Sequence, residues 1–131
     1  MLLLLDTHIL LTLARGEIEQ LPEPVQGALH VRRNALFASV ASLWEIAIKH
    51  RLGKLSSPCA LDKWPGALSA MAISLMEIHA SQALAEANPA ADTKDPFDRL
   101  LLAICEVENM RLVTLDRSLL GHRLVWGPAS A

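Results

Sequence analysis

The chain has 131 residues, of which 52% are hydrophobic and 20% charged, and its formal net charge at pH 7 is −2. This length and composition exclude a disordered chain and predict one globular domain over residues 1–131. The small negative charge excludes a strong general attraction to nucleic acid, so any RNA contact has to come from basic residues clustered locally.

The predicted elements alternate between short apolar strands and helices. The four leucines at 2–5 form an apolar run without alternation, which is typical of a strand buried on both faces of a parallel sheet. In chain order, we expect a strand at 2–5, helices at 9–14 and 25–33, a strand at 35–38, helices at 39–52 and 62–70, a strand at 73–78, helices at 80–87 and 95–109, and strands at 111–115 and 123–126. This order predicts an α/β fold with a parallel sheet and right-handed crossovers.

Four carboxylates fall where such a fold binds ligands. Asp6 and Asp116 each directly follow an expected strand, and Glu45 and Asp98 each lie near the start of an expected helix. The carboxyl ends of parallel strands and the N-termini of the following helices share one edge of the sheet. We therefore expect these four acids, which come from distant parts of the chain, to meet at that edge.

Three of these acids also have purely structural explanations. Asp95-Pro96-Phe97-Asp98 is a good helix start, with Asp95 as the N-cap and Asp98 favourable to the helix dipole. Asp6 and Asp116 can be ordinary turn residues. Crowded carboxylates, however, raise one another's pKa values unless a cation lies among them. Oxygen ligands without paired His or Cys suit Mg²⁺ or Mn²⁺, so we expect Asp95 to be the cap and Asp98 a metal ligand.

Glu45 has two structural readings that the sequence leaves open. Ser42 and Glu45 have the spacing of a capping box. If Ser39 is the cap instead, Glu45 faces Lys49 as an i,i+4 ion pair worth about 0.2–0.5 kcal/mol. The helical period places these polar residues on a narrow stripe beside a broad apolar face. That face consists of Val40, Leu43, Trp44, Ala47 and Ile48.

Several other residues carry no signal of chemistry. Cys59 and Cys105 are too few for a disulfide framework and lack the spacing of metal ligands. The histidines, His8 among them, have no mutual spacing that indicates a metal site. We expect Trp44 in the core or at an interface rather than as a base-stacking platform. The N-terminus has no signal-peptide pattern and no apolar run reaches the roughly 18 residues of a membrane span, so we expect a cytoplasmic protein without membrane contact.

Four blocks of the sequence, in this order and at these spacings, carry a family resemblance. They are LLLLDTHILL at 2–11, SVASLWEIAIKHRLGKL at 39–55, DPFDRLLLA at 95–103 and LVTLDRSL at 112–119. The chain resembles the PIN-domain ribonucleases, and in particular the VapC-like toxins of bacterial toxin–antitoxin pairs, over nearly its whole length. The resemblance implies a three-layer α/β/α sandwich around a mostly parallel sheet. It also implies a metal-dependent endoribonuclease directed at single strands, whose activity inhibits translation and growth.

The resemblance assigns Asp6, Glu45, Asp98 and Asp116 to the acidic catalytic cluster. We expect the cluster to hold one or two Mg²⁺ or Mn²⁺ ions, with Asp6 and Asp98 as direct ligands. Asp116 and Glu45 then complete the metal shell through water or orient the attacking water. The supporting and RNA-contacting residues expected around them are Thr7 and Thr114, which can hydrogen-bond a carboxylate, and the basic residues Lys49, Arg51, Lys54, Arg99 and Arg117.

The implied partners are an RNA substrate, a second copy of the chain in a homodimer, and a cognate VapB-like antitoxin that covers an apolar groove near the site. Two other classes of function were weighed. A receiver domain needs adjacent acids early in the chain and a haloacid-dehalogenase-like phosphatase needs Asp-x-Asp, whereas Asp6-Thr7-His8 offers neither. A non-catalytic binding module with this fold is the other alternative, and the presence of all four acids argues against it.

Overall fold

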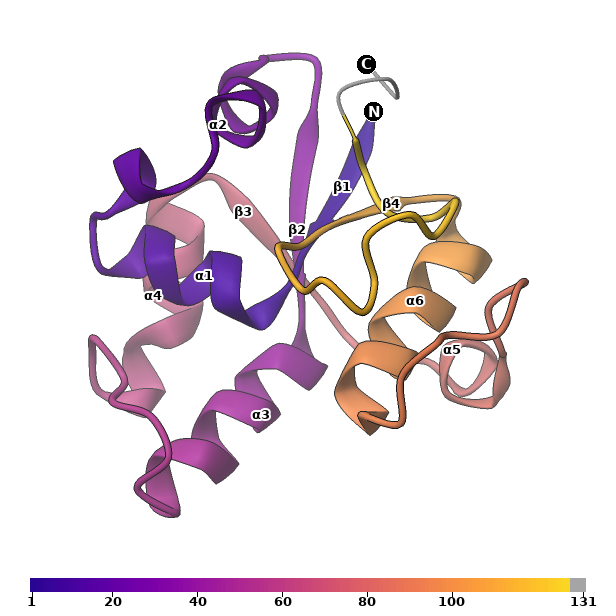
Figure 1. Ribbon diagram of the computed structural model, residues 1–131. Helices are drawn as coiled ribbons and strands as arrows, with labels where there is room; N and C mark the ends of the chain where they lie inside the picture. Colours follow the sequence, from indigo (N-terminus) through magenta and orange to yellow (C-terminus); the bar gives the residue numbers. More distant parts are fainter. Residues whose placement is uncertain (128–131) are drawn as a thin grey trace.

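The computed structural model describes residues 1–127 and contains one four-stranded parallel sheet. Its strands are β1 (Leu2–Leu5), β2 (Ala35–Ser39), β3 (Ile73–Met76) and β4 (Arg111–Val113), and they lie in the order β3-β2-β1-β4 (Figure 1). All three strand pairs are parallel, with Leu4 opposite both Phe37 and Leu112. This sheet confirms the prediction of an α/β fold.

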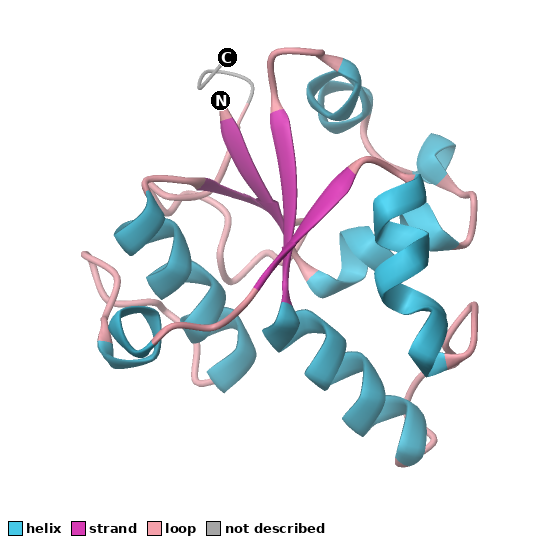
Figure 2. Cartoon of the chain, turned by 180° about the vertical axis from the view of Figure 1, so that it is seen from behind, coloured by secondary structure: helices cyan, strands magenta, loops and turns pink. Residues whose placement is uncertain are grey.

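Helices cover both faces of the sheet, as Figure 2 shows from behind. One face packs against α1 (Thr7–Ala14), α2 (Glu23–His30) and α4 (Trp64–Ala70), and the other against α6 (Pro96–Glu108) with α5 (Ala80–Leu84) beside it. The leucines of β1 divide between the two cores: Leu3 and Leu5 join the first, and Leu4 the second. All three are fully buried, as their unalternating pattern predicts.

Capping residues explain where several helices begin. The helix expected from residue 9 begins at Thr7, because the Asp6 carboxylate caps it by accepting the Ile9 N–H at 3.0 Å. The helix expected at 25–33 is α2, Glu23–His30, because Pro24 fits a first helical turn, where its missing N–H is not needed.

Two further caps at helix starts are clear, of which one settles an open question and the other confirms a prediction. The Ser39 hydroxyl accepts the Ala41 N–H at 3.0 Å, so Ser39 and not Ser42 caps α3 (Val40–Arg51). Asp95 caps α6 by accepting the Phe97 N–H at 2.8 Å, as predicted.

Four predicted elements need correction. The helix expected at 80–87 ends at Leu84, where Ala85 turns extended. The strand expected at 123–126 does not form: in the described part of the chain, Val125 makes a single bridge to Leu112. The bridge itself is made, since the Leu112 N–H donates to the Leu124 carbonyl at 2.7 Å and the Trp126 N–H donates to the Leu112 carbonyl at 2.8 Å. It does not continue toward residue 123, because the Leu124 N–H donates to His122 Nδ1 at 3.1 Å and the Met110 N–H donates to the Cys105 carbonyl at 3.0 Å. The strands expected at 73–78 and 111–115 are shortened to 73–76 and 111–113, and two short 3-10 helices are present at Ile18–Gln20 and Leu61–Lys63.

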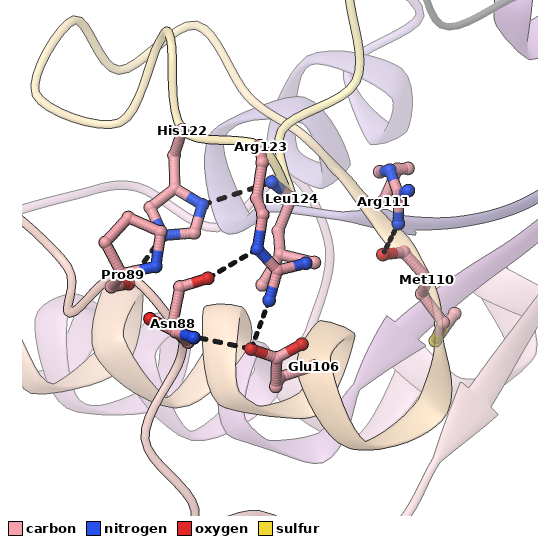
Figure 3. Close-up of polar contacts among 8 residues, drawn as sticks. All are labelled: Asn88, Pro89, Glu106, Met110, Arg111, His122, Arg123 and Leu124. Carbon is pink, nitrogen blue, oxygen red and sulfur yellow. Dashed lines mark hydrogen bonds and ion pairs between the residues drawn. The ribbon is translucent and has the colours of Figure 1, made fainter.

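Polar contacts fasten the chain after β4 onto α6 (Figure 3). The Arg123 guanidinium donates to the Asn88 carbonyl and to the Glu106 carboxylate, and the Asn88 N–H donates to Glu106 at 2.9 Å. The His122 Nε2 lies 2.8 Å from the Pro89 carbonyl. These contacts hold the far end of the loop that leaves β4, and that loop carries Asp116. Within residues 1–127, no helix combines the length and the apolar content that a membrane crossing requires.

Candidate acidic site

A cavity of about 350 Å³ lies where β1 and β4 end and where α1, α3 and α6 begin. Parallel strands bring these ends to one edge of the sheet (Figure 1). All four acids expected from the sequence line the cavity. The lining residues are Asp6, Thr7, His8, Glu45, Lys49, Asp95, Asp98, Leu115 and Asp116.

Asp6 is the most deeply fixed of the acids. It is buried, it accepts the Ile9 N–H at 3.0 Å, and its second oxygen accepts the Thr114 hydroxyl. Burial raises its pKa above the ordinary value, and these two hydrogen bonds counteract part of that rise. Thr114 also accepts the Asp116 N–H at 3.0 Å, so one hydroxyl links the carboxylate at the end of β1 to the backbone after β4.

Glu45 is held between a hydroxyl and an ammonium group. The Thr7 hydroxyl donates to Glu45 Oε1 at 2.6 Å, and the Lys49 ammonium forms an ion pair with Oε2. The bond to Glu45 raises the pKa of Lys49, which keeps its positive charge at the cavity. The i,i+4 reading of Glu45 and Lys49 is therefore correct, and both side chains also line the cavity.

The pKa values of Asp98 and Asp116 are shifted in opposite directions. Asp98 is half-buried, and burial raises its pKa to about 7, with further contributions from the negative charges of Asp95 and Asp116. The backbone N–H and hydroxyl of Ser118, at 2.9 and 2.8 Å, lower the pKa of Asp116. Near neutral pH, Asp98 therefore retains a proton more readily than Asp116 does.

Three lining residues, Asp95, His8 and Leu115, were not expected at the site. Asp95 is the predicted cap, yet it also lines the cavity. His8 lies in the first turn of α1, and its charge lowers the pKa of Asp6. The only feature of the sequence that could have placed them at the site is their position, because each lies within three residues of an acid already assigned to this edge of the sheet.

The basic residues expected near the acids are mostly elsewhere. Among residues 1–127, Lys49 is the one of the five that lines the cavity. Arg99 donates to Glu86 and to the Thr93 carbonyl, both at 3.0 Å, and lines a separate hollow. The other three, Arg51, Lys54 and Arg117, are exposed.

The chemistry of the donors fits a hard divalent cation. In the described part of the chain, five carboxylates line the cavity with one lysine and one histidine. Such an excess of oxygen donors is typical of Mg²⁺ and Mn²⁺ sites. The acids do not form a preorganised coordination site, since no three His, Cys, Asp or Glu side chains within 1–127 converge as ligands. Instead, Thr114, Thr7, Lys49 and Ser118 hold three of the acids by hydrogen bonds.

Ser42, one turn before Glu45, has a buried hydroxyl that lacks a hydrogen-bond partner in the described chain. Ser42→Ala is expected to stabilise the protein by about 1 kcal/mol, because a buried unpaired hydroxyl costs roughly 1–3 kcal/mol. Urea unfolding measures the change. Ser39→Ala, at the cap of the same helix, is the matched control and is expected to destabilise by about 1 kcal/mol. A loss of stability in Ser42→Ala would mean that its hydroxyl is bound in solution.

Comparison with known proteins agrees with this arrangement. The model of the PIN-domain family, described as PIN domain, matches residues 3–121. Searches of curated proteins and of solved structures gave no match. The matched segment contains every acid that lines the cavity and all of the sheet except Leu2. The chain belongs to the PIN-domain family.

Proposed function

We propose that this chain is a single PIN-like nuclease domain over residues 1–131, which hydrolyses phosphodiester bonds of single-stranded RNA with Mg²⁺ or Mn²⁺. PIN domains are typically metal-dependent nucleases. One observation carries the proposal for this chain: among residues 1–127, five carboxylates crowd one cavity with a single lysine. Such crowding is unfavourable for the isolated protein and becomes favourable when a divalent cation binds.

In this proposal, Asp6, Asp98 and Asp116 hold the cation, and Glu45 orients water. A divalent cation bound there would activate water and offset the charge of the phosphate. Thr114 fixes the Asp6 carboxylate, and Thr7 fixes Glu45 at 2.6 Å. Both carboxylates are therefore held in a defined orientation before a cation binds.

Lys49 has a second part in the proposal. Its ammonium is bonded to Glu45, yet its side chain is 39% exposed and lines the cavity. It is the basic residue best placed to meet a phosphate oxygen. Arg51, Arg99 and Arg117 remain proposed contacts to the RNA backbone farther from the cavity.

We also propose the cellular role. The sequence blocks resemble VapC-like toxins, and PIN proteins often pair with antitoxins. The chain would then be the cytoplasmic toxin of a type II pair. A VapB-like antitoxin would hold it inactive, it would form a homodimer, and its activity would inhibit translation and growth.

The first test is cleavage of a labelled single-stranded RNA, and of its duplex, with Mg²⁺, Mn²⁺ or EDTA. Cleavage is expected only with metal and only for the single strand. Asp6→Asn is expected to lower the rate of RNA cleavage about 100-fold or more, because it removes the charge that holds the cation. The Asn side-chain oxygen can still cap α1, so the fold is expected to persist. Asp62→Asn, in a distant 3-10 helix, is the matched control. A wild-type protein that binds Mg²⁺ without cutting any RNA would favour the binding module instead.

A further inference from the structure

Two aromatic side chains join the helices that start at the acidic cavity. Trp44 of α3 and Phe97 in the first turn of α6 pack edge to face, with ring centroids 5.7 Å apart and planes at 72°. Trp44 directly precedes Glu45, and Phe97 directly precedes Asp98. Each ring is therefore next in sequence to a carboxylate that lines the cavity, although the cavity lining includes neither ring.

The sequence led us to expect Trp44 in the core or at an interface, and the structure excludes the core. Trp44 is 60% exposed, whereas Trp64 and Trp126 are 1% and 8% exposed. The edge-to-face contact holds the indole against Phe97 but leaves most of its surface open to solvent. A large aromatic surface held in place beside a catalytic cavity is suited to stacking rather than to packing a core.

The surroundings of the pair favour a nucleobase over a protein partner. Two exposed charged residues, Lys94 and Arg99, lie close in sequence to Phe97, and Lys49 lies in the basic last turn of α3, the helix that carries Trp44. The cores of protein interfaces are depleted of charged residues. Single-stranded RNA, by contrast, is bound by aromatic side chains that stack on bases, next to cations that meet phosphates.

We propose that Trp44, supported by Phe97, is a stacking subsite for an unpaired base of single-stranded RNA, next to the phosphate in the acidic cavity. This inference rests on the proposed function, since it takes the cavity as the place of the scissile phosphate. It accounts for selectivity toward single strands, because a base within a duplex has its faces covered. The contact is tolerant of sequence, since every base has an aromatic face.

The test measures binding and cleavage separately. Binding of a fluorescent single-stranded RNA 12-mer is followed by anisotropy in the Asp98→Asn background with Mg²⁺, and cleavage is measured in the native background. Trp44→Ala is expected to weaken binding about 5- to 100-fold, and Trp44→Phe to restore most of it. Leu84→Ala, at another exposed apolar side chain that is 87% exposed, is the matched control and is expected to leave binding unchanged. Thermal melting checks that each variant is folded.

A series of oligonucleotides, each with one abasic position, identifies the stacked base. At one position, removal of the base is expected to weaken binding to the native Trp44 protein but not to Trp44→Ala. Equal weakening of all oligonucleotides by Trp44→Ala would overturn the stacking proposal. A second result would also overturn it: Trp44→Ala binds and cleaves RNA as the native protein does but has an altered oligomeric state. The aromatic pair would then be a contact between protein chains.

The same measurements separate this inference from the proposed function. Binding that depends on Trp44 in a wild-type protein that cuts no RNA would support the subsite and reject the nuclease. Cleavage by wild type that Trp44→Ala leaves unchanged would reject the subsite alone. A wild-type protein that neither binds nor cuts RNA would reject both.

Discussion

Asp98→Asn is expected to abolish metal-dependent RNA cleavage, by about 100-fold or more, and at the same time to stabilise the metal-free protein at pH 8. The carboxylate is half-buried among other acids, and its pKa is raised to about 7. Asn keeps nearly the same shape but cannot carry the charge that attracts a cation. Activity and stability therefore change in opposite directions, as expected for a residue whose charge serves function.

The pH dependence of this stability follows from the direction of the shift. Because the pKa of Asp98 is higher in the folded chain than its ordinary 3.8, the folded state binds more protons between about pH 4 and 7. The free energy of unfolding therefore falls as pH rises through that window, and Asp98→Asn removes this fall. The difference in pKa corresponds to about 4 kcal/mol at most, and solvent screening of a half-exposed group reduces the expected gain to about 1–2 kcal/mol. The lost interaction with the dipole of α6, about 0.3–1 kcal/mol, is smaller.

Urea unfolding in EDTA at pH 5 and pH 8 measures this effect, and the gap between wild type and variant is expected to widen at pH 8. Adding Mg²⁺ is expected to stabilise wild type but not Asp98→Asn. Asp92→Asn, at an exposed acid in the loop before the same helix, is the matched control. Full cleavage by Asp98→Asn would return Asp98 to the role of a residue that only favours a helix start.

Thr114→Val is expected to destabilise the protein by about 2–4 kcal/mol and to lower cleavage at least about 10-fold. The Thr114 hydroxyl donates to Asp6 and accepts the Asp116 N–H at 3.0 Å. Valine fills nearly the same volume without either bond, so it leaves a buried carboxylate oxygen and a backbone N–H unpaired. Each unpaired group costs roughly 1–3 kcal/mol. Cleavage falls because Asp6 loses the contact that fixes its orientation.

Two controls separate this effect from the mere loss of a hydroxyl. Thr114→Ser keeps both hydrogen bonds and is expected to stay within about 1 kcal/mol of wild type. Thr12→Val removes another buried hydroxyl, which donates to the His8 carbonyl at 2.9 Å within α1. That carbonyl also accepts a backbone hydrogen bond of the helix, so no group is left unpaired. The free energy of unfolding is therefore expected to change by less than about 1 kcal/mol. Equal melting of Thr114→Val and wild type would show that the link between Asp6 and Asp116 contributes nothing.

The sequence predicted the features of this protein that depend on local periodicity and on topology. The unbroken leucines at 2–5 indicated a strand buried on both faces, because neither face of such a run is polar enough for water. The spacing Asp95-Pro96 indicated a helix start, because capping uses only neighbouring residues. Parallel topology then placed Asp6, Asp98 and Asp116 at one edge, since that edge follows from strand direction alone.

Other features were decided by contacts between distant segments. Thr114 lies 108 residues from Asp6, and Thr7 lies 38 residues from Glu45, so no local pattern pairs these side chains. The helical period put Trp44 on an apolar face, but which part of that face is covered depends on how α6 packs against α3.

The structure of the segment after β4 and the pKa values at the site also depend on contacts between distant segments. Residues 123–126 have the composition of a strand, yet the two N–H groups that would extend the bridge donate elsewhere, that of Leu124 to the His122 side chain and that of Met110 to the Cys105 carbonyl. The pKa values of Asp98 and Asp116 differ because burial and hydroxyl donors reach them unequally in the folded chain. The sequence by itself therefore determined which acids meet, and the tertiary structure decided how each one is held, because burial and long-range hydrogen bonds exist only once the chain has folded.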